Sequence, residues 1–150
     1  QIMQSEFYTK DGDKGETLEF SFENGLDEHP SHVVYNGNAS SLVKNPLRAK
    51  AGDTVRIFLT NAGPNFVDSL QILEQTIDRV YPEGSLTTAP LEGLQTTVVP
   101  SGGSSMAEFK VEVPGVYLNV DHSIFRIAKG AVGLLKVDGP ESPDIYKGLK

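Results

Sequence analysis

The sequence contains no cysteine, and it has only three histidines and two methionines among its 150 residues. Without cysteine the chain cannot form a disulfide, a thiolate nucleophile or any metal site that requires a thiolate ligand. A single histidine cannot hold copper or zinc tightly either, because such sites take about three or four protein ligands. A metal bound by one of these histidines would therefore need ligands from another chain or another domain.

The chain also lacks a long apolar run and an excess of positive charge. No apolar stretch approaches the ~20 residues that span a bilayer, so we expect no membrane span. The net charge of −7 predicts an acidic surface that repels nucleic acid and anionic membranes, and neither is an expected partner. The length and the hydrophobic fraction of 38% are typical of one globular domain. Because the chain starts with Gln1 and shows no signal peptide, we interpret it as a mature protein, a fragment or an excised domain.

What is present is mostly β-strand pattern. In residues 54–61, for example, Val55, Ile57 and Leu59 alternate with polar side chains, which is the period of a half-buried strand. Pairs and clusters of Gly, Pro, Asn and Asp separate such runs. Many short strands punctuated in this way predict an all-β sandwich or barrel. The strands we predict span residues 17–22, 32–35, 54–61, 94–99, 105–113, 116–120 and 132–137.

One short helix is predicted over residues 123–129, with Asp121 or Ser123 at its start and Gly130 after its end. By composition, residues 1–16 are interpreted as a linker or arm, and residues 139–150 as an extended C-terminal tail. Residues 17–138 then form the folded domain.

His122 lies in the stretch VDHSIFR, between a predicted strand and the predicted helix. It is a candidate metal ligand, and a structural histidine is the alternative interpretation. The consecutive Asp121-His122-Ser123 does not match a hydrolase triad, which is assembled in space from separate segments. His29 and His32 are three residues apart, but Pro30 argues against the helix that would aim both at one metal ion.

Several stretches together resemble the second, C-terminal cupredoxin domain of copper-containing nitrite reductases. They are residues 47–65, 78–84, 94–103, 113–117 and 120–126, and residues 3–10 resemble the linker that leaves the first domain in that family. The resemblance covers nearly the whole chain. It implies a Greek-key β-sandwich of cupredoxin type with one short helix.

The resemblance also implies a function. Members of this family are homotrimers of two-domain subunits, located in the periplasm or on the cell surface. A type 1 copper in the first domain accepts electrons, and a type 2 copper between subunits reduces nitrite to nitric oxide with one electron and two protons. His122 matches the single type 2 copper ligand that the second domain supplies. The resemblance thus implies copper as cofactor, nitrite as substrate, and a homotrimer or a first cupredoxin domain as partner.

Two departures from the family pattern concern the chemistry. The chain has no type 1 site, because it has no cysteine. Gln71 stands where the family has a proton-relay histidine, and an amide does not titrate near neutral pH. Leu73 matches the apolar residue that faces the copper. We therefore expect the chain alone to be inactive, and the alternative is a non-catalytic cupredoxin-like module for structure or oligomerisation, without copper. A domain of another multicopper oxidase is a third interpretation, which the scarcity of histidine disfavours.

Overall fold

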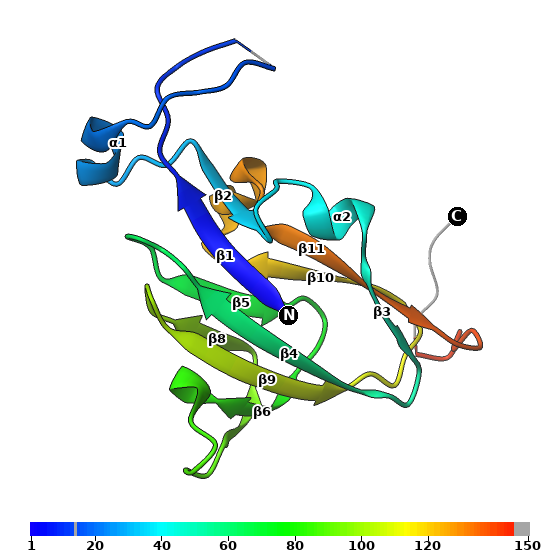
Figure 1. Ribbon diagram of the computed structural model, residues 1–150. Helices are drawn as coiled ribbons and strands as arrows, with labels where there is room; N and C mark the ends of the chain where they lie inside the picture. The colour runs from blue at the N-terminus through cyan, green and yellow to red at the C-terminus, as the bar shows by residue number, and fades with distance from the viewer. Residues whose placement is uncertain (14, 146–150) are drawn as a thin grey trace.

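The computed structural model, which describes residues 1–13 and 15–145, contains two β-sheets packed face to face (Figure 1). Most neighbouring strands are antiparallel, but β1 pairs with β4 and β3 pairs with β11 in parallel. The predicted all-β sandwich is confirmed. In spatial order the first sheet is β2 (His32–Tyr35), β1 (Ile2–Phe7), β4 (Thr54–Asn61), β9 (Ser104–Lys110), β6 (Ile77–Tyr81) and β7 (Leu91–Leu94). The second is β3 (Leu47–Lys50), β11 (Val132–Asp138), β10 (Gly115–Asp121), β5 (Asp68–Ile72) and β8 (Thr96–Val99).

The core lies between the two sheets and follows from the alternation of side chains along the strands. In β4, Ile57 and Leu59 are buried while Arg56 and Phe58 point outward. Strand β5 shows the same alternation, with inward Leu70 and Ile72. Each strand thus contributes every second side chain to one apolar layer. The largest fully buried apolar side chains are Tyr35, Phe109, Ile2, Leu59, Leu70, Ile72, Ile77 and Leu135.

The helices are short and lie at the connections. The predicted helix over residues 123–129 is a 3₁₀ helix, η2 (Ile124–Lys129), which packs beside β2. It ends where predicted, because Gly130 adopts a φ of 115° that side-chain-bearing residues rarely reach. The prediction of a single helix was incomplete, since the described part of the chain contains three further short helices. They are α1 (Phe22–Leu26), α2 (Ser41–Lys44) and η1 (Pro82–Gly84).

The structure departs from the sequence-based expectation at the N-terminus. Ile2–Phe7, which fall in the expected linker, form β1 between β2 and β4 in the first sheet. The predicted strand over 17–22 is wrong: the segment makes only an isolated bridge from Phe20 to Thr9 and then enters α1. The pattern was misleading because Phe20 and Phe22 are exposed and face no core.

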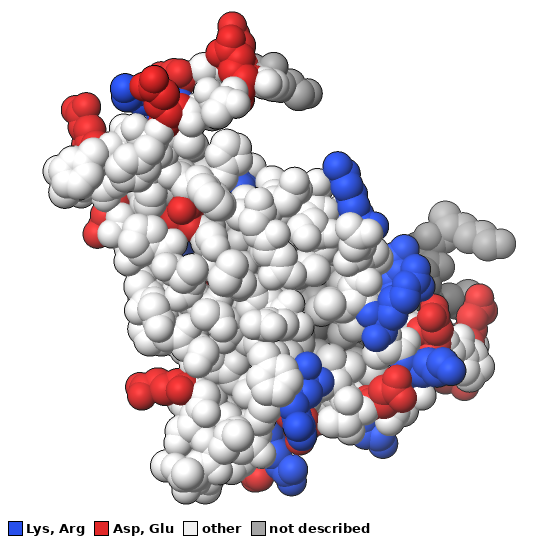
Figure 2. All heavy atoms as spheres, viewed as in Figure 1, with Lys and Arg blue, Asp and Glu red and all other residues white. Residues whose placement is uncertain are grey.

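Charged and uncharged surfaces are separated in the view of Figure 2. Acidic side chains gather over the segment between β1 and β2, which carries α1, and basic ones gather near β3 and along one lower edge. Between them lies a broad uncharged face over β1, β2 and β4. In the described residues no helix has the length and apolarity needed to cross a bilayer. Of the predicted tail over 139–150, residues 146–150 lie outside the described residues.

Candidate functional site

His122 directly follows strand β10 and is exposed. Its backbone N–H donates to the carbonyl of Ser69, at 2.8 Å, which extends the pairing of β10 with β5 by one residue. Asp121 before it is completely buried. The alternation of the strand thus continues through the turn and leaves the imidazole on the outer face of the second sheet.

Gln71 lies on the neighbouring strand β5, where the register pairs it with Val120 of β10 and with Thr96 of β8. Because directly opposed residues point to the same side of a sheet, Gln71 shares the outer face with Val120 and therefore with His122. Its side-chain Oε1 accepts a hydrogen bond from the Thr96 hydroxyl at 3.2 Å. The structure thus brings two of the predicted site residues, Gln71 and His122, to one face.

Leu73 lies in the turn that follows β5 and is half-buried. Its backbone N–H donates to the carbonyl of Leu118 on β10, at 2.8 Å. Two positions beyond Gln71, it continues the same outer face along the strand direction. Leu73 therefore adds an apolar side chain at the far end of the row formed by His122 and Gln71.

A buried carboxylate lies directly behind the histidine. It belongs to Asp121, which the sequence suggested only as a possible helix start. Asp121 Oδ1 accepts from the backbone N–H of Ser69, at 3.2 Å, and of Ser123, at 3.0 Å. Asp121 Oδ2 accepts from Arg126 Nη1 at 2.5 Å and from Gln4 Nε2 at 3.3 Å. Every oxygen of this carboxylate is thus engaged, and the charge of Arg126 balances it.

Asp68, at the start of β5, is a second buried carboxyl group, close enough to Asp121 and Arg126 to feel their charges. No protein group of the described residues hydrogen-bonds to either of its oxygens. Burial, and secondarily the negative charge of Asp121, raise the pKa of Asp68 from 3.8 to about 8, against a smaller lowering by Arg126. The carboxyl is therefore largely protonated at neutral pH. The buried Tyr35 hydroxyl and the side chain of Asn119 also lack protein partners.

The residues present can supply one metal ligand at this face but not a complete site. Within residues 1–13 and 15–145, no three His, Cys, Asp or Glu side chains come together as a metal-binding group. His122 is exposed, so a group from outside the chain can reach its side chain. This arrangement fits a ligand shared with another polypeptide segment and does not fit a metal held by this chain alone.

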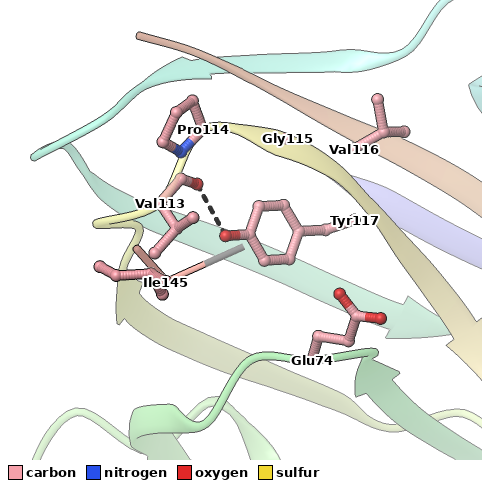
Figure 3. A pocket seen from close by; sticks show the side chains of 7 residues that line it. All are labelled: Glu74, Val113, Pro114, Gly115, Val116, Tyr117 and Ile145. Carbon is pink, nitrogen blue, oxygen red and sulfur yellow. Dashed lines mark hydrogen bonds between the residues drawn. The ribbon is translucent and has the colours of Figure 1, made fainter. Parts of the chain in front are cut away.

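A separate hollow lies at the opposite end of β10 and contains no histidine. It is lined by Glu74, Val113, Pro114, Gly115, Val116, Tyr117 and Ile145. Figure 3 shows the Tyr117 ring lying across this hollow, with its hydroxyl donating to the Val113 carbonyl at 2.7 Å. The Tyr117 hydroxyl is already bonded to the chain, and Glu74 is the one carboxylate of the lining. The hollow therefore presents no set of side chains suited to metal binding or catalysis. The face of His122 remains the candidate site.

Known proteins resemble the chain over nearly its whole length. It is 46% identical over 147 residues to the copper-containing nitrite reductase of Neisseria gonorrhoeae, covering 96% of this chain and 37% of that protein. It is 30% identical over 122 residues to the copper-containing nitrite reductase of Neorhizobium galegae, covering 80% of this chain and 32% of that protein.

Over most of its length the chain is similar to one part of the copper-containing nitrite reductases. It spans 37% and 32% of the length of the two relatives named above, so it corresponds to one part of such a protein. No protein-family model matches the chain.

Solved structures of the family share the fold of this domain. The copper-containing nitrite reductase from Thermus scotoductus superposes with a TM-score of 0.80 at 28% identity, over 93% of this chain and 32% of that chain. The copper nitrite reductase from Nitrosomonas europaea gives a TM-score of 0.77 at 28% identity, over 98% of this chain and 51% of that chain. A multicopper oxidase with a TM-score of 0.72 at 21% identity shows the same fold. The predicted cupredoxin-type sandwich is thus confirmed.

Proposed function

We propose that this chain is the second cupredoxin domain of a nitrite reductase that forms nitric oxide, and that it supplies His122 to a type 2 copper shared between subunits. The observation that carries the proposal is the accessible His122 on a domain that is similar to this family and whose described residues hold no complete metal site. A ligand presented outward, with none beside it, suits a site completed by another subunit. The partner is then a first cupredoxin domain within a homotrimer.

A copper ion bound at His122 would supply a one-electron redox centre and a Lewis acid for a nitrite oxygen. Overall, nitrite takes up one electron and two protons and yields nitric oxide and water. The electron has to come from outside this chain, because a type 1 site needs a cysteine and the sequence has none. We therefore propose that the chain alone does not turn over nitrite.

The other residues of the face orient groups rather than transfer protons. The Gln71 amide can donate to an oxyanion or a water, and its carbonyl is already bonded to Thr96. Because an amide does not titrate near neutral pH, Gln71 cannot act as a general acid. Leu73 presents apolar surface on the same face, which would exclude water from one side of a bound anion.

Gln71 also supports a second candidate function, a cupredoxin-like module that keeps the sandwich and its contacts between subunits but binds no copper. This alternative predicts that the assembly contains no copper dependent on His122. The family's extracytoplasmic location, in the periplasm or at the cell surface, is proposed for this protein on this similarity alone.

Copper analysis of the native assembly tests the proposal. The wild-type assembly should contain type 2 copper, recognised by its electron paramagnetic resonance spectrum, and the H122A variant should lose it. The H29A variant is a matched control, because His29 is likewise exposed but lies in the loop after α1. Type 2 copper that survives in the H122A variant would contradict the ligand assignment. Its absence from the wild-type assembly would favour the copper-free module.

A further inference from the structure

We propose that Asp121, held in place by Arg126, is the positioning residue for His122. The buried carboxylate fixes the backbone on both sides of the exposed histidine, so that the imidazole is presented to a metal in one orientation. The inference rests on the proposed function, because it concerns the histidine to which that function assigns the metal. It adds residues inside the sandwich that touch neither metal nor substrate.

The first observation is a set of hydrogen bonds around His122. Asp121 Oδ1 accepts from the N–H of Ser69 on β5 and from the N–H of Ser123, so it links strand β5 to the residue that follows His122. His122 itself donates its N–H to the Ser69 carbonyl at 2.8 Å. Both backbone groups of Ser69 are therefore engaged by the dipeptide Asp121–His122. An exposed turn residue would otherwise be among the more mobile parts of the fold.

The second observation is the ion pair between Arg126 and the Asp121 carboxylate. Arg126 Nη1 donates to Asp121 Oδ2 at 2.5 Å and to the Val67 carbonyl at 2.7 Å. Its guanidinium carbon lies 4.2 Å from the centre of the Phe66 ring. Because an ionised carboxylate that is completely buried needs a charged partner, removal of Arg126 would leave Asp121 uncompensated. The arginine thus connects η2 to the residue before His122.

The third observation is that side chains of β1 hydrogen-bond to both Asp121 and Phe66. Gln4 Nε2 donates to Asp121 Oδ2 at 3.3 Å, and Glu6 Oε1 accepts from the Phe66 N–H at 2.6 Å. Both side chains are buried although both are polar. Strand β1 therefore contacts both the Asp121 carboxylate and the backbone of Phe66, whose ring lies beneath Arg126.

The expected consequence is a preorganised ligand. Residues that orient metal ligands without touching the metal typically change metal affinity about 10–100-fold when they are replaced. We expect the R126Q variant to lose copper affinity by a factor in that range. The R126K variant, which retains the positive charge, should recover most of the loss. The R56Q variant is the matched control, because Arg56 pairs with Glu108 at 2.6 Å on the other sheet.

The experiment uses the native assembly and two readouts. Amide hydrogen exchange without copper reports the backbone of residues 122 and 123, and titration with copper alone reports the affinity. R126Q should accelerate exchange at both amides at least about tenfold and weaken copper binding, whereas R56Q should change neither. The F66L variant removes the ring beneath Arg126 with less disruption. It should shift both readouts in the same direction, which keeps the test decisive if R126Q does not fold.

The H122A variant separates this inference from the proposed function. If H122A abolishes copper binding while R126Q and F66L leave both exchange and affinity as in the wild type, the positioning role is overturned and the proposed function stands. If H122A retains the type 2 copper, the proposed function fails. Asp121 would then have no ligand to position, whatever the exchange data show.

Discussion

At the scale of single residues, Asp68 has the most unusual environment in the structure. Its side chain is completely buried beside Asp121, and its raised pKa means that the folded protein keeps a proton that the unfolded chain releases. Between about pH 4 and pH 8, the unfolded state therefore binds fewer protons than the folded state, and stability falls as the pH rises. The burial of Asp68 therefore lowers the free energy of unfolding, and lowers it more as the pH rises across this range.

We therefore predict that the D68N variant is more stable than the wild type at pH 7. An amide has nearly the same shape and no charge to bury, so the gain should be on the order of a few kcal/mol. It should shrink toward zero as the pH falls to about 4. Thermal or urea unfolding between pH 4 and pH 8 measures this. The D27N variant is the control, because Asp27 is exposed; a gain for D68N that does not depend on pH would contradict the prediction.

Gln71 is the residue that decides whether this face could do proton chemistry. In the complete assembly, the Q71H variant should raise nitrite turnover, because a positioned acid–base group typically contributes about 10²–10⁴ in rate. The rate should also acquire a pH dependence near the ordinary pKa of histidine, about 6.5. The Q75H variant, in the turn after β5, is the control. Unchanged turnover in Q71H would show that residue 71 does not occupy the relay position.

At the scale of elements, a long apolar alternation predicted β4, whereas the polar inward side chains of β1 concealed that strand. The predicted strand 54–61 coincides with β4, whose inward Ile57 and Leu59 carry a clear period. In β1 the inward positions are Ile2, Gln4 and Glu6, so two of three buried side chains are polar and the pattern is hidden. No single-sequence pattern reveals that Glu6 bonds to Phe66, 60 residues away, and Gln4 to Asp121, 117 residues away.

Two other elements show the limits of patterns in short segments. Residues 94–99 were predicted as one strand, but Leu94 is the last residue of β7, and Thr96–Val99 form β8 in the other sheet. Strands β3, β5 and β6, each four or five residues long, were not predicted. The face of Gln71 and His122 depends on β5 and its register with β10, so it could not be assembled from the sequence pattern alone.

Strand β1 is expected to behave as part of the core. Ile2 is fully buried in the main apolar cluster, so the I2A variant should lose about 2–5 kcal/mol of unfolding free energy. The adjacent Met3 is 42% exposed on the other face of the strand, and the M3A variant should lose less than about 1 kcal/mol. Chemical denaturation of both variants measures the difference. Equal and small losses would show that β1 is an appended linker.

At the scale of the whole molecule, the sandwich divides its two sheets between different tasks. The first sheet includes β1, whose inward side chain Gln4 hydrogen-bonds to Asp121. The second sheet carries Gln71 and His122 on its outer face, with Asp68 and Asp121 behind them. The interior thus holds the Asp121 carboxylate, which bonds to Arg126 and to the backbone beside His122, while the imidazole of His122 is exposed.

A site shared between subunits makes a prediction that no arrangement within one subunit makes. Assemblies of H122A subunits alone, and of subunits whose first-domain copper ligands are removed, should both lack type 2 copper. Mixed assemblies of the two should regain part of it, because an intact His122 of one subunit then meets intact first-domain ligands of its neighbour. Copper content and the type 2 resonance after co-expression measure the recovery. Because a site built within one subunit would stay broken in every mixed assembly, a complete lack of recovery would contradict the shared site.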